Sequence, residues 1–171
     1  AGREITALEE EASTPQAYQE IMNQAPTLAA NTPRVEAAVR LDDIVGSTDM
    51  SMAIQKSTGI AVYGAIVQAM APGTPVDISG FEAHWRANEQ QIRAQTQQMV
   101  VISYVYTYRT LDDESLAAYE AFVSSPASRK FNEAVTEGLR FGMNEAVAGW
   151  AAAIADIVVD MQEVAAPQPG G

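Results

Sequence analysis

Cysteine is absent from this chain of 171 residues, and histidine occurs only once. Without cysteine the protein has no disulfide, no thiol nucleophile and no thiolate metal site. The absence of disulfides leaves the compartment open, because exported bacterial proteins often lack them. One histidine also leaves a transition-metal site without its usual ligands. His84 could act as a base, but a lone histidine on a polar helix face is usually only solvated. We therefore expect neither a metal nor another cofactor.

Basic residues and long uncharged apolar runs are also scarce. The chain has 10 lysines and arginines against 22 aspartates and glutamates, which gives a formal net charge of −12. Such a charge repels nucleic-acid phosphates and anionic lipids, so the sequence predicts no nucleic-acid partner. The longest apolar region, Leu139 to Val159, is interrupted by Arg140, Glu145 and Asp156. Because charges are costly in lipid, we expect no membrane insertion.

The remaining composition favours a globular protein built from helices. Hydrophobic residues make up 47% of the chain, and in most segments they recur at intervals of three or four residues. This spacing predicts an all-α, single-domain bundle of about six to seven helices over residues 1–165. The last helix is predicted to be long, from Pro126 to about Val164. The tail at 166–171, which ends in Pro-Gln-Pro-Gly-Gly, is predicted to be disordered.

Helix caps and breaks divide the chain further. They predict helices over residues 3–12 and 15–24, a third that opens at Asn31, a fourth over 50–70 and a fifth after Gly80. The segment from Val100 to Tyr108 is the exception, because β-branched and aromatic residues alternate in it as in a strand. No second strand-like segment could pair with it, so we predict the end of a long, mostly buried helix.

Two helix starts follow this segment. Thr110 and Asp113 have the spacing of a capping box, and acidic residues fill the first turn that follows. Ser124 is the predicted end of that helix. Ser125 before Pro126 is the next start, since serine is a good N-cap and proline is tolerated at the first helical position. The helix between them has its apolar residues on one face: Leu116, Tyr119, Phe122 and Val123.

This region resembles the signature half of the bacterial domain of unknown function 2059 family. The resemblance covers about residues 100–150, and Ser128 stands where a small residue, usually glycine, is expected. It implies an all-helical, exported bacterial protein, and it carries no catalytic residue over to this chain. The residues assigned to the structural signature are Arg109, Leu111, Asp113, Phe122, Ser125, Pro126 and Gly142, and the matching motif also includes Tyr108, Leu116, Tyr119, Ala127 and Arg129.

A stripe of small residues lies in the last predicted helix. Gly138, Gly142, Ala146, Gly149 and Ala153 follow one another at steps of three or four residues, so another helix could approach them closely. We expect tight packing within the domain, with Gly142 at a close helix crossing. The alternative is the seam of a homodimer.

Two groups of carboxylates could carry chemistry. Asp42, Asp43 and Asp49 surround a glycine but lack the spacing of a calcium loop, so we predict a helix-end cluster in solvent. Asp112 and Asp113 could form an acid-base pair, yet their place at a helix start already accounts for them. The sequence therefore predicts no catalytic residue with a specific motif.

Aromatic residues are the remaining candidates for a site. Tyr104, Tyr108 and Tyr119, with Trp85, could line an apolar ligand pocket with polar tips, although core packing is the commoner use of such residues. The favoured function is a non-enzymatic binding module for a protein partner or a small apolar ligand. The alternative is a carboxylate-based hydrolase-like enzyme that uses His84 or Asp112.

The compartment follows from the family resemblance and not from a leader sequence. The chain does not open with a basic segment followed by an apolar one, so we expect that any export signal has been removed or never existed. The resemblance implies a periplasmic or secreted protein. A deep pocket in which carboxylates converge would favour the enzyme, whereas an apolar groove or a symmetric dimer seam would favour the binding module.

Overall fold

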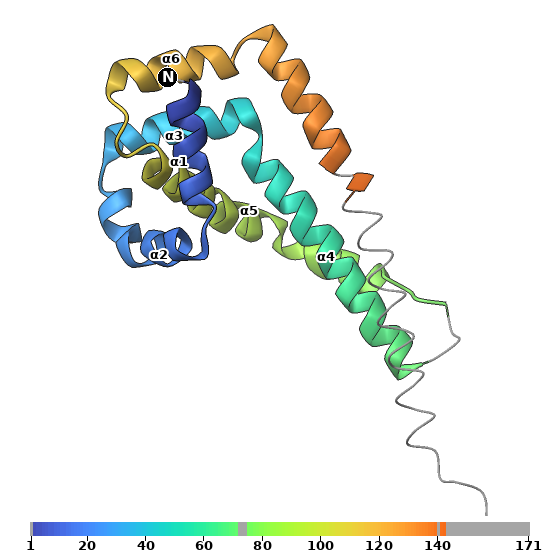
Figure 1. The fold of residues 1–171 in the computed structure, drawn as a ribbon. Coiled ribbons are helices and arrows are strands. Elements are labelled where there is room, and N and C mark those ends of the chain that lie inside the picture. The colour runs from blue at the N-terminus through green and yellow to red at the C-terminus, as the bar shows by residue number, and fades with distance from the viewer. Residues whose placement is uncertain (1, 72–74, 140, 143–171) are drawn as a thin grey trace, which may run out of the picture. The chain divides into compact units, whose positions relative to one another are not determined.

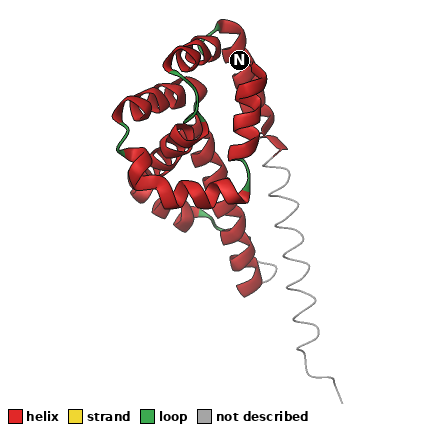
Figure 2. Cartoon of the chain, turned by 60° about the vertical axis from the view of Figure 1, so that its left-hand side comes forward, coloured by secondary structure: helices red, strands yellow, loops and turns green. Residues whose placement is uncertain are grey.

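The computed structural model describes residues 2–71, 75–139 and 141–142. These parts contain seven helices and no strand, so the all-α class is confirmed (Figures 1 and 2). The first six helices are α1 (Gly2–Ala12), α2 (Pro15–Ala29), α3 (Thr32–Val45), α4 (Ser47–Met70), α5 (Ser79–Thr107) and α6 (Asp113–Val123). The seventh runs over residues 126–139 and is called the 126–139 helix below.

The prediction of a long last helix is wrong for the part that the structure describes. The 126–139 helix is shorter than α4, with 24 residues, and α5, with 29. The predicted continuation to Val164 and the predicted disordered tail at 166–171 lie outside the described residues, apart from Phe141 and Gly142.

The chain divides into two compact units. The first comprises Ala1–Ser51 and Gln91–Val135, and the second comprises Met52–Gln90 and Thr136–Gly171. Three helices, α4, α5 and the 126–139 helix, contribute residues to both units. A single domain over residues 1–165 stays a prediction.

Polar side chains cap the helices that the sequence analysis places correctly. Thr14 accepts a hydrogen bond from the backbone N–H of Ala17 at 3.2 Å, and Ser125 accepts one from Ser128 at 3.2 Å. The prediction of a capping box that begins at Thr110 is wrong. α6 begins three residues later, because Asp112 has extended backbone angles and accepts a hydrogen bond from the N–H of Ser115 at 2.7 Å.

A buried carboxylate joins α3 to α4. Gly46, whose φ of 77° is left-handed, ends α3, and α4 starts at the next residue, three positions before the predicted start. Asp42 is only 3% exposed, and it accepts hydrogen bonds from the backbone N–H and the hydroxyl of Thr48, at 2.8 and 2.6 Å. The prediction that Asp42 lies in solvent is therefore wrong, because its carboxylate is buried and caps the following helix.

The strand-like segment from Val100 to Tyr108 is helical, as predicted. Its β-branched and aromatic side chains supply much of the core of the first unit, which outweighs their weak preference for helix. The core has two clusters. One comprises Ala17, Ile21, Leu28, Ala38, Val101, Ile102, Val105 and Tyr106, and the other comprises Ala37, Leu41, Tyr108, Leu111, Leu116 and Val123.

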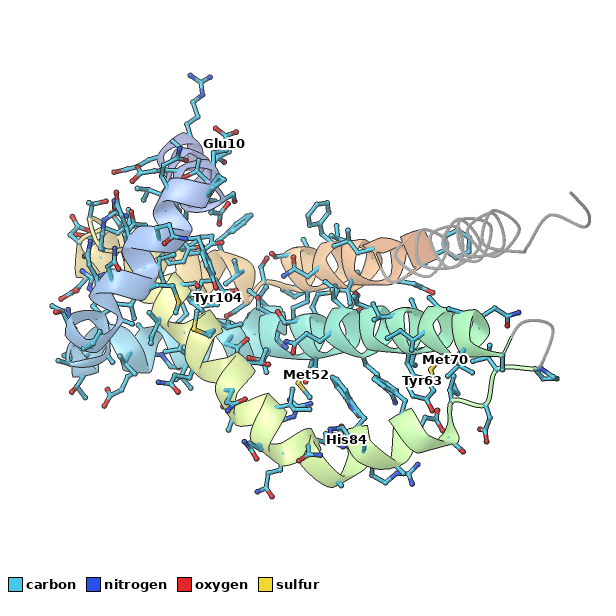
Figure 3. All side chains as sticks on the ribbon, turned by 90° about the horizontal axis from the view of Figure 1, so that it is seen from below. Glu10, Met52, Tyr63, Met70, His84 and Tyr104 are labelled. Atoms are coloured by element: carbon cyan, nitrogen blue, oxygen red, sulfur yellow. The ribbon has the colours of Figure 1, made fainter. Side chains whose placement is uncertain are left out.

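Aromatic rings hold α4 against the start of α5 in the second unit. Tyr63 extends from α4 towards α5 (Figure 3), and the ring of Phe81 lies 6.0 Å from its ring centroid. Trp85 stacks on Phe81 as well, with ring centroids 6.1 Å apart. Phe81 meets α4 at Gly59, where an added Cβ would lie 2.6 and 2.8 Å from two of its ring atoms. The contact therefore requires glycine.

We expect Gly59→Ala to lower the free energy of unfolding by about 1 to 3 kcal/mol, because Tyr63 and Trp85 leave the ring of Phe81 little room to move. Denaturant unfolding followed by circular dichroism measures the change. Gly138→Ala is the control, since no heavy atom lies within 4 Å of a Cβ built there. That variant should gain up to about 1 kcal/mol from helix propensity. An equal gain at Gly59 would contradict the close contact.

Candidate functional site

Three tyrosines from two helices form one cluster in the first unit. Tyr104 and Tyr108 lie one turn apart at the end of α5, with ring centroids 5.9 Å apart. Tyr119 comes from α6, and its ring centroid lies 5.2 Å from that of Tyr108. We call these residues the tyrosine cluster. Trp85 is not part of it, since it belongs to the second unit and stacks on Phe81.

One carboxylate of α1 receives two hydroxyls of this cluster. Tyr108 donates a hydrogen bond to Oε1 of Glu9 at 2.8 Å, and Tyr119 donates one to the same atom at 2.9 Å. The third hydroxyl, that of Tyr104, is hydrogen-bonded to the hydroxyl of Ser47. Hydrogen bonds to an ionised acceptor are about twice as strong as those between neutral groups. Glu9 therefore links α1 strongly to the end of α5 and to α6.

The tyrosine hydroxyls resist ionisation at this place. Burial, together with the hydrogen bond to Glu9, raises the pKa of Tyr119 to about 12. Burial also raises the pKa of Tyr108 and of Tyr104 above the ordinary value of 10.0. A charged tyrosinate beside the carboxylate of Glu9 would be repelled, so the cluster is stable only in its protonated form.

A second carboxylate of α1 binds the signature arginine. Arg109 donates a hydrogen bond to Oε1 of Glu11 at 2.7 Å and another to the backbone carbonyl of Tyr106 at 2.8 Å. Its guanidinium also lies 3.9 Å from the centroid of the Tyr106 ring. Since α1 has no fully buried residue, these polar contacts and the half-buried side chains of Ile5 and Leu8 hold it in place.

The other signature residues have structural contacts. Leu111 is buried at 3% exposure, and its carbonyl accepts a hydrogen bond from Arg34. Arg34 also forms an ion pair with Asp113 at 3.2 Å, but that carboxylate is almost fully exposed, so the pair contributes little stability. Asp112 is fixed as a cap, because its hydrogen bond from Ser115 lowers its pKa. These residues position α6.

An apolar groove of about 1070 Å³ runs along α1 on the side of α6 and the start of the 126–139 helix. Every residue that lines it belongs to the first unit. Phe122 and Phe131 are 65% and 67% exposed although both line the groove. Tyr119 lines it from α6 and Glu9 from α1, while Glu10 and Arg3 add charge along α1. The remaining lining is mostly small or apolar, including Ile5, Ala7, Ala118, Val123, Ala127 and Ser128.

The predicted site residues lie in two different places in the structure. Tyr119 and Phe122 line the groove, whereas Tyr104 and Tyr108 lie in the core beside a cavity of about 10 Å³. Such a space holds at most one water molecule. Glu9 and Phe131 were not predicted as site residues. Only the strongly amphipathic pattern of α1 could have drawn attention to Glu9, and it does not identify a partner.

The predicted close crossing at Gly142 is not found in the described part of the chain. No heavy atom lies within 4 Å of a Cβ built at Gly138 or at Gly142, and both glycines are exposed. The rest of the small-residue stripe, Ala146, Gly149 and Ala153, lies outside the described residues.

Two further findings concern ligands and membranes. Within residues 2–71, 75–139 and 141–142, no group of three or more histidines, aspartates and glutamates could hold a metal ion. Among the described helices, none is long and apolar enough to cross a membrane. No family model, curated protein or solved structure matches the chain.

We expect the free energy of unfolding to fall as the pH rises from 10 towards 12, the range between the ordinary tyrosine pKa and that of Tyr119. Unfolded tyrosines ionise near 10, whereas the folded cluster keeps its protons to higher pH, so alkali favours unfolding. Below pH 10 this contribution is fully present. Urea unfolding at a series of pH values measures the slope.

Tyr119→Phe should make this fall less steep, because the variant removes one of the hydroxyls with a raised pKa. Tyr18→Phe is the matched control, since Tyr18 is 54% exposed and lies outside the cluster. Equal slopes for Tyr119→Phe and the parent protein would contradict the burial of that hydroxyl beside Glu9.

Proposed function

We propose that the protein is a non-enzymatic binding module that holds an apolar ligand in the groove beside α1. The observation that carries the proposal is the pair of phenylalanines, Phe122 and Phe131, that are about two-thirds exposed on its walls. Ligand sites are concave and mostly apolar, with a few polar groups that set orientation. Glu9, Glu10 and the hydroxyl of Tyr119 are such polar groups at this groove.

The exposed rings give the groove a source of binding energy. Covering a large apolar side chain that is otherwise exposed is worth about 1.5 to 3 kcal/mol. Two phenylalanines therefore offer enough energy for a weak complex before any polar contact forms. Because α6 and α1 are held by caps and by tyrosine hydrogen bonds, the walls need little rearrangement.

The geometry gives less support to the hydrolase-like alternative. His84 is exposed on α5 in the second unit, whereas Asp112 lies in the first and caps α6. Glu9, the carboxylate nearest the tyrosines, already accepts two hydroxyl hydrogen bonds. A general acid or base needs a proton-transfer partner within hydrogen-bond reach, and in the described part of the chain His84 contacts Asn88 and Asp112 contacts Ser115, neither of which is an acid or base.

We also infer membership in the domain of unknown function 2059 family and a place in the periplasm or outside the cell. The support is the set of signature residues, whose contacts are those of a structural motif. Ser125 caps the 126–139 helix, Arg109 links α5 to α1, and Leu111 is a core residue. A binding module without catalytic residues fits that resemblance.

The neutral fluorophore N-phenyl-1-naphthylamine is a suitable probe, because its fluorescence rises in apolar surroundings and it is not repelled by an acidic protein. We expect saturable binding by the parent protein. Phe122→Asp should weaken it at least about tenfold, since it places a charge on the apolar wall. Ala118→Trp should weaken it as well, because the larger side chain fills the groove without adding charge.

Phe141→Asp is the matched control. Phe141 is 70% exposed, like Phe122, but does not line the groove, so this variant should bind as the parent does. Equal losses from both aspartate variants would mean that the probe binds elsewhere. No saturable binding by the folded parent protein would contradict the proposal outright.

A further inference from the structure

The last turn of α1 brings negative charge to the apolar groove. Glu9 and Glu10 both line the groove, Glu11 follows them, and the turn contains no basic residue. The carboxyl end of a helix carries a partial negative charge, so cations are favoured there. Arg109 offsets this charge only at Glu11. We call Glu9, Glu10 and Glu11 the acidic turn.

The hydroxyls beside the acidic turn have no proton left for a ligand. Tyr119 and Tyr108 both donate to Oε1 of Glu9. Within the parts of the chain that the structure describes, no hydrogen bond is found at Oε2 of Glu9, and no ion pair engages Glu9 or Glu10. Carboxylate oxygens only accept hydrogen bonds. The acidic turn therefore offers a ligand acceptors with negative charge.

Positive charge in the groove does not reach the acidic turn. Of the described residues that line the groove, only Arg3 is basic. Arg3 precedes Glu10 by seven residues, which is about 10 Å along the axis of α1. The negative charge of the acidic turn thus remains for a ligand to neutralise.

The exposed rings of the groove begin one helical turn from the hydroxyl that binds Glu9. Phe122 follows Tyr119 by three residues on α6, so these side chains are neighbours on the helix surface. Phe122 and Phe131 are 65% and 67% exposed. The face of a phenyl ring also attracts a cation. The groove therefore places apolar surface beside negative charge.

We propose that the ligand of this groove is a cationic amphiphile, with its ammonium group at Glu9 and Glu10 and its apolar tail over Phe122 and Phe131. The inference rests on the proposed function, because it names the class of ligand for the same groove. An anionic head group at this place would be repelled by both carboxylates, and a neutral one would leave their charge uncompensated.

Three compounds with the same octyl tail separate the effect of the head group from that of the tail. They are octylammonium, which is cationic at neutral pH, 1-octanol, which is neutral, and octyl sulfate, which is anionic. Isothermal titration calorimetry at low salt measures each Kd. We expect octylammonium to bind about fivefold more tightly than octanol, the effect of one partly exposed charge pair, and octyl sulfate to bind most weakly. Added salt should reduce the preference for the cation.

Glu10→Gln removes one charge and keeps the size of the side chain. The preference for octylammonium over octanol should fall about threefold in this variant, while the Kd of octanol stays unchanged. Glu4→Gln is the matched control, since Glu4 is exposed on α1 but does not line the groove. That variant should keep the preference of the parent. Ala118→Trp, which fills the groove, should weaken the binding of octylammonium and of octanol.

Equal binding of octylammonium and octanol by the parent protein overturns this proposal but leaves the proposed function standing. Tighter binding of octyl sulfate also overturns it, and would assign the head group to Arg3 or to the start of the 126–139 helix. So does an equal loss of preference in Glu4→Gln and Glu10→Gln, because the net charge of the chain would then explain the preference. If none of the three compounds binds to the folded parent, both proposals fail. The comparison of the three compounds on the parent protein stands even if a variant unfolds.

Discussion

The first unit depends on one carboxylate. Glu9 accepts hydrogen bonds from the hydroxyls of Tyr108 and Tyr119, and it thereby joins α1 to the end of α5 and to α6. α1 buries no residue completely, so apolar packing alone holds it weakly. The tyrosines in turn need a buried acceptor, because an unpaired buried hydroxyl costs about 1 to 3 kcal/mol. Each side therefore satisfies a requirement of the other.

This link also shapes the groove. Glu9 and Tyr119 both line it, and so does Glu10, which lies on α1 (Figure 3). If α1 moved away, the groove would lose one side, and Phe122 would stand on an open surface. A second polar contact, the hydrogen bond from Arg109 to Glu11, holds the same end of α1. The apolar walls are thus held by polar contacts at the end of α1 that joins α2, while the side chain of Phe122 stays exposed.

The sequence predicts what local chemistry decides. Thr14 and Ser125 cap helices where expected, and the strand-like segment from Val100 is helical because no second strand exists to pair with it. Contacts between distant residues escape such reasoning. Glu9 lies 99 and 110 residues from the two tyrosines it binds, and nothing local distinguishes it from the neighbouring glutamates. The predicted close helix crossing at Gly142 was wrong for the opposite reason. Its spacing within a stripe of small residues permits a close helix crossing, but the described structure places no other helix against it.

A double-mutant cycle on Glu9→Ala and Tyr119→Phe tests the central claim most directly. The free energy of unfolding of the parent, the two single variants and the double variant is measured in urea at neutral pH. Because the carboxylate and the hydroxyl share one hydrogen bond, the account predicts a coupling energy of about 1 kcal/mol or more. Additive effects, with a coupling below about 0.3 kcal/mol, would contradict the claim that this contact holds α1 to the core.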